Sequence, residues 1–449
     1  MRRPHYSVLF AIGLVALLAL GAVVVVGIIV MLQAPAEFRS LATQSIAVLM
    51  LVFLGVLLLR YGSLVWLAYM HAVEQSAGAR DGKDGHGTYL PPVSILLPAY
   101  NEGAVIESAI RSLLRLDYPR YEIVVVDDGS TDDTAEKAAR FEGEFDSVRV
   151  RVYSKSNGGK ASALNLGLHV ADYPFVVTMD GDSILSPNTL RDTMHHFLRP
   201  EVAAVAGNVK VGNRVNLLTR LQALEYVEGL NIPRRAQAAV RAVNIVPGPV
   251  GVFRRDVLLQ VGGYDSDTFA EDTDLTLKLL SKGWRVVYED RAVAWTEAPE
   301  TFRDLMKQRY RWTRGILQAL DKHRSTLWSR DGDAAVRVSI VNLLFEIIVW
   351  PALNIFGHLG FSFVALGYGM PATVVAWWLL ITLVEVAVAL LAVSLEEEEL
   401  SLVPMAVLYR FFFIFVVDVV KLLASLEEFL KLEMNWGKLA RTGSVTEST

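Results

Sequence analysis

Long charge-free stretches constrain the fold of this chain more than any other feature of its sequence. Residues 7–32 contain no Asp, Glu, Lys or Arg, and neither do residues 347–384. The first stretch would form about 39 Å of helix, enough to cross a bilayer. The second is too long for one crossing, and Gly367–Pro371 is its natural break. The hydrophobic residues, 53% of the chain, are therefore concentrated in membrane spans.

We predict two spans near the N-terminus and about three near the C-terminus, the latter at about 338–366, 372–394 and 402–424. A signal peptide is the alternative for the first span, but its apolar core would exceed the usual length of about 7–15 residues. The expected organisation is 1–75, two transmembrane helices; 76–90, linker; 91–299, catalytic domain; 300–335, amphipathic interface helices; 336–426, C-terminal transmembrane helices; and 427–449, tail.

The distribution of basic residues predicts the orientation in the membrane. Five of them flank the first two spans on one side: Arg2, Arg3, Arg60, Arg80 and Lys83. We therefore expect the N-terminus and the central domain to be cytoplasmic. Three further spans would place the tail outside, whereas Lys431, Lys438 and Arg441 favour the inside, so the side of the C-terminus stays open.

The central part of the chain alternates short apolar runs with helical patterns. Residues 93–97, 122–126 and 175–179 are β-branched and apolar, as in buried parallel strands. Helical segments near 103–115, 132–141 and 160–171 lie around and between them. This alternation predicts a doubly wound α/β sheet, in which ligands bind at the carboxyl ends of the strands.

Acidic residues follow two of these predicted strands. Asp127 and Asp128 come directly after one, and Asp180 and Asp182 come after another. Carboxylates gathered in one crevice repel one another unless a hard cation neutralises them, which suggests Mg²⁺ or Mn²⁺ carrying a phosphorylated ligand. Turn chemistry is the alternative explanation for Asp and Gly here, but the matched positions after two strands favour the metal site.

Residues 157–160 (Asn-Gly-Gly-Lys) open the next predicted helix. Glycine allows close backbone approach, a helix N-terminus favours anions, and Lys160 supplies a positive charge for a diphosphate. The segment does not match Gly-x-x-x-x-Gly-Lys-Ser/Thr, so a nucleotide hydrolase of that type is unsupported. An ordinary turn remains the alternative.

Two further motifs follow along the chain. Residues 270–274 (Ala-Glu-Asp-Thr-Asp) begin a helix, where acids also compensate the helix dipole. Gln308, Arg311 and Trp312 stand at i, i+3 and i+4 and share one helix face. Arg binds phosphate and Trp stacks on a sugar ring, so this face suits a sugar diphosphate. A basic helix on the membrane surface is the alternative for 300–324.

Net charge and cysteine content narrow the possible functions. The formal net charge of −5 gives no basic excess and argues against a nucleic-acid partner. The absence of cysteine excludes disulfides, thiolate zinc sites and a Cys nucleophile.

In this order the motifs resemble those of the processive, membrane-integrated family 2 glycosyltransferases, which include cellulose, hyaluronan and chitin synthases. They are Asp-Asp-Gly-Ser from Asp127, Asp-x-Asp from Asp180, Glu-Asp at 271–272 and Gln-x-x-Arg-Trp at 308–312. The resemblance covers about 90–440 and is nearest to bacterial poly-β-1,6-N-acetylglucosamine synthases. It implies a GT-A-like α/β domain inserted between transmembrane helices.

The resemblance also implies roles for the acidic residues. Asp127 or Asp128 would hold the uridine of a UDP-sugar donor. Asp182 would ligate Mg²⁺ or Mn²⁺, supported by Asp180. Asp272, beside Glu271, would be the general base that takes a proton from the acceptor hydroxyl.

The remaining motif residues would bind the two substrates. Lys160 and Arg311 would balance the diphosphate, Trp312 would stack on the terminal acceptor sugar, and Gln308 would donate a hydrogen bond nearby. Gly248 lies near the acceptor in a Pro-Gly pair where relatives tend to have Ser-Gly. This departure bears on which sugar is polymerised.

The expected function is therefore an inverting, processive polymerisation of a UDP-sugar, with UDP-N-acetylglucosamine favoured, into an exported exopolysaccharide of the biofilm type. The partners would be the donor, the growing glycan, the lipid bilayer of the bacterial inner membrane and a small membrane accessory subunit. Alternatives are a non-processive glycosyltransferase acting on a lipid or lipid-phosphate acceptor, and a transport or scaffold protein that only binds nucleotide.

Membrane-embedded charges are costly and so indicate a path for the product. The candidates are Glu346, Glu385, Arg410 and Asp418, the last two forming an intramembrane pair as the alternative. Residues 396–399, four consecutive glutamates, are expected to form a solvated loop between spans.

Overall fold

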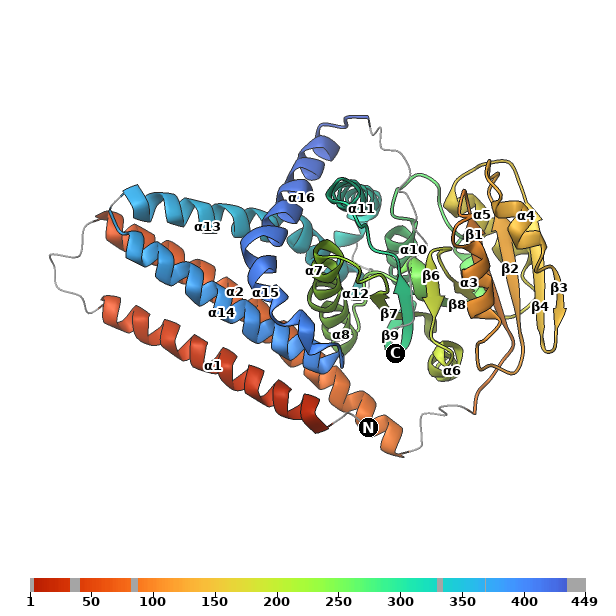
Figure 1. Cartoon of the computed structure of the whole chain (residues 1–449), viewed down its shortest axis with the longest axis horizontal. Coiled ribbons are helices and arrows are strands. Elements are labelled where there is room, and N and C mark those ends of the chain that lie inside the picture. Colours follow the sequence, from red (N-terminus) through yellow and green to blue (C-terminus); the bar gives the residue numbers. More distant parts are fainter. Residues whose placement is uncertain (1–3, 33–40, 82–87, 329–333, 368, 434–449) are drawn as a thin grey trace.

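The computed structural model describes residues 4–32, 41–81, 88–328, 334–367 and 369–433. Figure 1 shows a mixed α/β domain at one end of the molecule and a bundle of long helices at the other. Several residues of the orientation argument, among them Arg2, Arg3, Lys83, Lys438 and Arg441, lie outside the described residues.

The α/β domain is built on one mixed sheet in the order β3-β4-β2-β1-β5-β8-β7-β9-β6. Its strands are β1 Val93–Ala99, β2 Tyr121–Asp127, β3 Gly143–Phe145, β4 Val148–Ser154, β5 Phe175–Thr178, β6 Ser183–Leu185, β7 Val202–Val211, β8 Gly251–Arg254 and β9 Arg285–Thr296. The three strands predicted from apolar runs are β1, β2 and β5, and they pair in parallel with β1 in the middle. The sheet as a whole is mixed, because β8 pairs antiparallel with both β5 and β7.

Helices cover the sheet and extend away from it. They are α1 Pro4–Leu32, α2 Leu41–Asp81, α3 Ile106–Leu113, α4 Thr134–Ala139, α5 Lys160–Val170, α6 Thr189–Met194, α7 Leu217–Tyr226, α8 Ile232–Ala239, α9 Arg255–Gln260, α10 Glu271–Ser281, α11 Phe302–His323, α12 Ala334–Leu344, α13 Trp350–Gly367, α14 Pro371–Leu395, α15 Met405–Leu408 and α16 Ile414–Phe429. Short 3₁₀ or π segments join several of them, including η2 His195–Leu198, η3 Val227–Asn231 and η4 Gly248–Val250.

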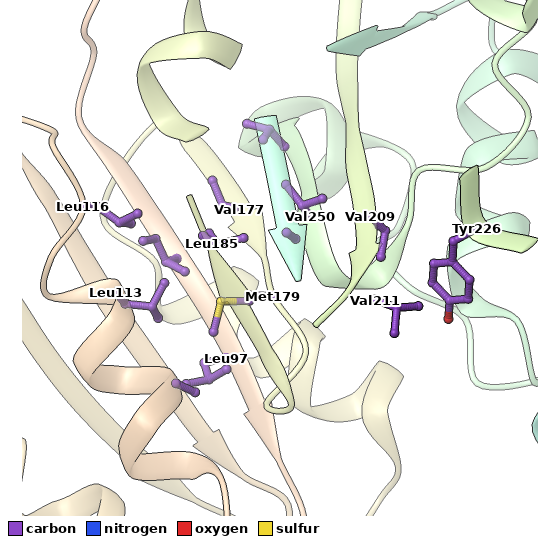
Figure 2. Close-up of a cluster of buried hydrophobic side chains, with 14 of the residues drawn as sticks. Leu97, Leu113, Leu116, Val177, Met179, Leu185, Val209, Val211, Tyr226 and Val250 are labelled. Atoms are coloured by element: carbon purple, nitrogen blue, oxygen red, sulfur yellow. The ribbon is translucent and has the colours of Figure 1, made fainter. Parts of the chain in front are cut away.

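The central strands are buried along their whole length. Every residue of β1 and of β2 is buried, because helices pack on both faces of the sheet. Figure 2 shows part of this core, where Leu97, Val177 and Met179 of the central strands lie near Leu113 of α3. The core fixes the carboxyl ends of β1, β2 and β5, and therefore the loops that carry the acidic motifs.

Within the described residues, four helical segments are long and apolar enough to cross a membrane: Val52–Gln75 within α2, Ala334–Gly367, Pro371–Leu395 and Leu400–Phe429. Helix α1 contains a shorter apolar segment among the described residues, Ser7–Ala22, and packs on α14. The arrangement of N-terminal and C-terminal apolar helices around an α/β domain is as predicted. Helix α2 continues to Asp81, into the segment expected to be a linker.

The acidic turn after α14 differs from the expected solvated loop. Glu396 and Glu398 are buried, with 5% exposure each. Glu396 pairs with Arg235 of α8 and accepts a hydrogen bond from Asn208 Nδ2 of β7 at 2.7 Å. Glu398 pairs with Lys210 of β7 at 3.0 Å. The expectation was wrong for these two residues because partners far away in the sequence neutralise them, which no local charge pattern can reveal.

Candidate active site

A cavity of about 480 Å³ lies beyond the carboxyl end of β5, where β5, α5, α10 and α11 meet. Nine of the predicted site residues line it: Lys160, Asp180, Asp182, Gly248, Glu271, Asp272, Gln308, Arg311 and Trp312. They come from positions far apart in the sequence, so the fold has brought most of the motifs into one place. Asp127 and Asp128 do not line this cavity.

Lys160, the first residue of α5, joins two of the motifs electrostatically. Its ammonium lies 2.7 Å from Asp180 Oδ1 and 2.7 Å from Glu271 Oε1. Burial opposes a charge here, but the two carboxylates outweigh it and raise the pKa of Lys160. Lys160 therefore remains a cation and holds the Asp-x-Asp loop against the start of α10.

Gly248 allows this ion-paired cluster to pack against the η4 segment. A Cβ at this position would lie 2.8 Å from Lys160 Nζ and 3.0 Å from Asp180 Oδ2. Such a distance is shorter than van der Waals contact permits, so a side chain would displace the Lys160–Asp180 pair. The Pro-Gly pair therefore shapes the wall of the cavity through the smallness of its glycine.

Asp272 is a partly buried carboxylate in the first turn of α10. Burial, reinforced by the charge of Glu271, raises the pKa of Asp272 to about 6. Its Oδ1 accepts a hydrogen bond from the backbone N–H of Thr273 at 2.6 Å. A carboxylate with a pKa nearer neutrality is a better proton acceptor than an ordinary aspartate, and Asp272 lines the cavity where an acceptor could reach it.

Asp182 is buried, with 6% exposure. Its Oδ1 accepts hydrogen bonds from Ser183 Oγ at 3.2 Å and from Thr296 Oγ1 of β9 at 3.3 Å. Glu102, in the loop after β1, packs so closely over the motif that a Cβ on Gly181 would lie 1.8 Å from its Oε2. Three carboxylates thus come from the ends of two strands: Asp180 and Asp182 follow β5, and Glu102 follows β1.

This donor set fits a hard divalent cation. Carboxylate oxygens are the ligands that Mg²⁺ and Mn²⁺ prefer. Among the described residues, Asp180 and Asp182 do not form a cluster with a third Asp, Glu or His whose ligand atoms all lie within 4.8 Å of one another. A cation that binds through one or two carboxylates and completes its shell with substrate phosphates suits such an open pair.

Asp127 and Asp128, at the end of β2, lie outside this cavity and make other contacts. Asp128 is 3% exposed, and its Oδ2 accepts a hydrogen bond from the Gly159 N–H at 2.7 Å. Its Oδ1 lies 2.7 Å from Lys155 Nζ. Asp127 Oδ1 accepts a hydrogen bond from the Ser130 N–H at 3.2 Å. Asp128 therefore fixes the Gly-Gly turn before Lys160, a positional role that the sequence motif alone did not indicate.

Helix α11 presents Gln308, Arg311 and Trp312 to the cavity, as their spacing predicted. Arg309, between them, does not line this cavity and is buried with 3% exposure. Its guanidinium lies 4.4 Å from the centre of the Trp312 ring and donates from Nε to Glu225 Oε1 at 3.0 Å. Arg309 thereby orients the indole that faces the cavity.

Several residues of this region were missed by the sequence reasoning: Glu102, Lys155, Glu225, Arg234, Thr296 and Arg309. Each contributes through a contact across long sequence separation, or stands beside a motif rather than in it. Glu102 carried a usable signal, because it follows the predicted strand 93–97. Lys155 follows β4, which was not predicted. Thr296 and Glu225 carried none.

A second cavity, of about 200 Å³, adjoins the first. The two share five lining residues: Leu230, Arg234, Ile245, Trp312 and Ile316. Beyond them the second cavity is lined by residues of the spanning helices, including Arg60, Glu346, Trp350 and Asp418. Arg60 and Glu346 form an ion pair at 2.8 Å. The carboxylate site therefore adjoins a second space between the apolar helices, and charged side chains contribute to the lining of that space.

Three of the membrane-embedded candidates, Arg410, Asp418 and Glu385, belong to a buried polar network. Arg410, fully buried, donates to Asn354 Oδ1 at 2.8 Å, and Asn354 Nδ2 donates to Asp418 Oδ2 at 2.6 Å. Arg410 also lies 3.7 Å from Glu385. The expected pairing of Arg410 with Asp418 is therefore indirect, through Asn354.

The fold is that of a GT-A-like glycosyltransferase. A solved mannosyltransferase from Pyrobaculum calidifontis, PcManGT in complex with GDP-Man and Mn²⁺, matches with a TM-score of 0.58 at 20% identity. The match covers 83% of this chain and 99% of that chain. At this identity the likeness establishes the fold alone.

The sequence establishes the family. The profile described as "Glycosyltransferase like family 2" matches residues 91–315, half of the chain, and the chain belongs to this family. Poly-beta-1,6-N-acetyl-D-glucosamine synthase of Staphylococcus aureus (strain COL) is 34% identical over 227 residues, 50% of this chain and 55% of the relative. The enzyme of the same name from Staphylococcus epidermidis is 34% identical over 255 residues, 57% and 60% of the two chains. The match thus spans little more than half the length of these relatives.

Proposed function

We propose that this protein is a processive, inverting β-glycosyltransferase that polymerises a UDP-sugar and exports the polymer across the membrane. One observation carries the proposal. The cavity that joins the acidic motifs, Lys160 and the Gln-x-x-Arg-Trp face adjoins a second cavity lined by the apolar helices. A transferase acting only on small soluble acceptors has no need of such a passage.

The residues of this chain would divide the chemistry as follows. Asp272 accepts the proton of the acceptor hydroxyl while that oxygen attacks the anomeric carbon of the donor. The bond between this carbon and the diphosphate oxygen breaks, and UDP leaves with the electron pair. Attack from the opposite face turns an α-linked donor into a β-glycosidic bond. Lys160 and Arg311 offset the charge of the departing diphosphate.

The proposed cation site is Asp182 with Asp180. Mg²⁺ or Mn²⁺ bound there would neutralise charge on the leaving diphosphate. Asp127 and Asp128 are proposed to form part of the wall of the uridine pocket. Asp128 would do so partly through the Gly-Gly turn that it holds.

The acceptor would lie against Trp312. An indole offers a flat apolar surface for a sugar ring, and Arg309 holds it in place from behind. Gln308, which also lines the cavity, can donate a hydrogen bond to a sugar hydroxyl. Since Trp312 lines both cavities, a polymer extended at Trp312 would enter the second cavity.

The favoured donor is UDP-N-acetylglucosamine. The support is that the Staphylococcus relatives are poly-beta-1,6-N-acetyl-D-glucosamine synthases. The wall formed by Gly248 and its preceding proline, where relatives tend to have Ser-Gly, is the place where the choice of sugar would differ. We further propose a cytoplasmic catalytic domain in the bacterial inner membrane, with a small membrane accessory subunit as a partner.

The decisive experiment supplies the full-length protein, in membranes, with a panel of labelled UDP-sugars and Mn²⁺ or Mg²⁺. We expect high-molecular-weight product from UDP-N-acetylglucosamine, and none after chelation of the metal with EDTA. The product should be degraded by a poly-β-1,6-N-acetylglucosamine hydrolase. Degradation by cellulase or hyaluronidase would contradict the donor. A single-sugar product on lipid would contradict processivity and support the non-processive alternative.

A further inference from the structure

A third cavity, of about 700 Å³, lies where the end of the span in α2 meets η2, α8 and β9. It shares no lining residue with the active-site cavity. Elements of the catalytic site nevertheless reach it. Strand β9 carries Thr296 at the active site and Arg285 and Arg291 at this cavity. Nothing in the proposed glycosyl transfer uses the residues of this cavity.

The lining is strongly basic. Its titratable residues are Arg199, Arg241, Arg285, Arg291, His71, His195 and His196, together with Glu74 and Glu289. Two of the arginines are neutralised by carboxylates. Arg291 Nε lies 2.9 Å from Glu289 Oε1, and Arg285 Nη1 lies 3.2 Å from Glu201 Oε1 at the rim. Within the described residues no ion pair joins Arg199 or Arg241 to a carboxylate, although a backbone hydrogen bond and, more weakly, the charges of Arg285 and Arg199 lower the pKa of Glu201. Both side chains are exposed and can take a further partner.

Three of the lining residues could instead suggest a metal site. Ligand atoms of His195, His196 and Glu289 lie within 4.8 Å of one another, and all three are buried. Arg199 Nη2 lies 3.0 Å from His196 Nδ1. A guanidinium can only donate, so Nδ1 must be the acceptor nitrogen and Nε2 must carry the proton that it donates to Glu289 Oε2 at 2.9 Å. Both ring nitrogens of His196 thus have protein partners, so this hydrogen-bonding pattern does not require a metal.

The C-terminal end of α8 places Arg241 on the wall of this cavity. Arg241 has φ = 59°, in the left-handed region where glycine is the ordinary residue. Its side chain is exposed on the cavity wall. Arg241 directly follows the C-terminal end of α8, where its N–H donates to the Ala238 carbonyl at 3.0 Å and the N–H of Ala242 donates to the Gln237 carbonyl at 2.8 Å, so the helix end accounts for this conformation.

Position indicates the source of the anion. His71, Glu74 and Gln75 occupy the last turn of the predicted span Val52–Gln75, so the cavity opens where this helix leaves the apolar layer. Phosphate groups of a bilayer lie at that depth. The planar guanidinium group of arginine can donate two parallel hydrogen bonds to phosphate oxygens. We propose that this cavity binds a phosphate group through Arg199 and Arg241, supplied by the headgroup of an anionic membrane lipid or by a soluble phosphate.

The test measures thermal unfolding of the full-length protein in the absence of any sugar donor, so it does not depend on the proposed function. The protein is placed in phosphatidylcholine nanodiscs, in nanodiscs containing phosphatidylglycerol, and in phosphatidylcholine nanodiscs with inorganic phosphate. We expect phosphatidylglycerol, inorganic phosphate or both to raise the unfolding midpoint. The double variant Arg199→Gln/Arg241→Gln should weaken the apparent affinity at least about tenfold.

A matched control removes two exposed arginines elsewhere, Arg111→Gln/Arg140→Gln, and should keep the full response. A response to phosphatidylglycerol alone assigns a lipid headgroup, and a response to inorganic phosphate assigns a soluble ligand. No response to either probe, or an equal response in the cavity variant, overturns the proposal. Stabilisation by Zn²⁺ that His196→Asn abolishes, without a phosphate response, also overturns it in favour of the metal site.

Discussion

At the scale of single residues, Asp272 is the clearest test of the proposed chemistry. Asp272→Asn removes the proton acceptor and should lower kcat by about 10²–10⁴-fold, with a smaller effect on donor KM. Because the pKa of Asp272 is raised to about 6, the wild-type rate should increase as pH rises through about 6, where the carboxylate loses its proton. The measurement is UDP release across a pH series.

The control for this variant is Asp267→Asn, an exposed carboxylate that pairs with Lys322 outside the cavity. It should retain the wild-type rate and pH profile. Near-wild-type polymerisation by Asp272→Asn would remove this residue from the role of base.

Gly248 is the second residue-scale test. In Gly248→Ala the added methyl group would press on Lys160 Nζ and on the Asp180 carboxylate, so the ion pair must shift. We expect at least about a tenfold loss in kcat/KM for the donor, which corresponds to about 1.4 kcal/mol, without loss of folding. Gly360→Ala in α13, where an added methyl group has open space, should leave both activity and stability nearly unchanged.

Sequence reasoning succeeded for residues whose chemistry is carried by their motif. The Asp-x-Asp and Gln-x-x-Arg-Trp residues line one cavity because strand ends and helix faces follow simple periodicities. It could not find Arg309 as the support of Trp312, since Glu225 completes that contact from another helix. It also could not show which of Asp127 and Asp128 holds the Gly-Gly turn, because the hydrogen bond from Gly159 to Asp128 joins residues that are 31 positions apart.

At the scale of elements, the turn after α14 joins the helical bundle to the catalytic domain. Glu396→Gln removes one of the two carboxylates that pair with buried Arg235, the other being Asp290, and should destabilise the protein by about 2 kcal/mol. Glu399→Gln is the matched control, because Glu399 is 59% exposed and lies 3.6 Å from Arg214. It should cost less than about 1 kcal/mol. Thermal unfolding in detergent at neutral pH measures both.

The same turn predicts a pH dependence. Burial opposes the charge of Glu396, but Arg235 and Lys210 outweigh it and lower its pKa below the ordinary 4.5. A carboxyl group whose pKa is lower when folded stabilises the protein above the unfolded pKa, and this stabilisation is lost as pH falls. The unfolding midpoint should therefore decrease below about pH 4.5 in the wild type, and less steeply in Glu396→Gln. Parallel curves for the two proteins would contradict this account.

The elements themselves were largely predictable. Strands β1, β2 and β5 and helices α3, α4 and α5 follow from apolar periodicity. Strands β7, β8 and β9 were not foreseen, and their antiparallel and parallel pairings depend on contacts between distant segments. The long apolar helices were evident from composition, whereas the buried role of Glu396 was hidden by its acidic neighbours.

At the scale of the whole molecule, the apolar helices line one cavity and the acidic motifs line another, and the two cavities adjoin. Spans were predictable from hydrophobicity alone, but their contact with the active-site cavity was not, because it depends on how α8 packs against α2 and α11 against α16. The polar network around Arg410 is likewise a property of the assembled bundle. Such intramembrane charges are retained where they line or support a polar path.

Blocking that path should separate glycosyl transfer from chain growth. Gly229 of η3 lines the second cavity, and a Cβ there would meet no atom nearer than Glu225 Cγ at 3.9 Å. Gly229→Ala should therefore be tolerated, whereas the indole of Gly229→Trp would occupy much of the roughly 200 Å³ space. We expect Gly229→Trp to release UDP in the presence of short acceptors and to make products at least about tenfold shorter, since each added sugar must advance into the cavity. Product length on gels, with UDP release measured in parallel, provides the test. Full-length polymer from a folded Gly229→Trp protein would show that the glycan leaves by another route.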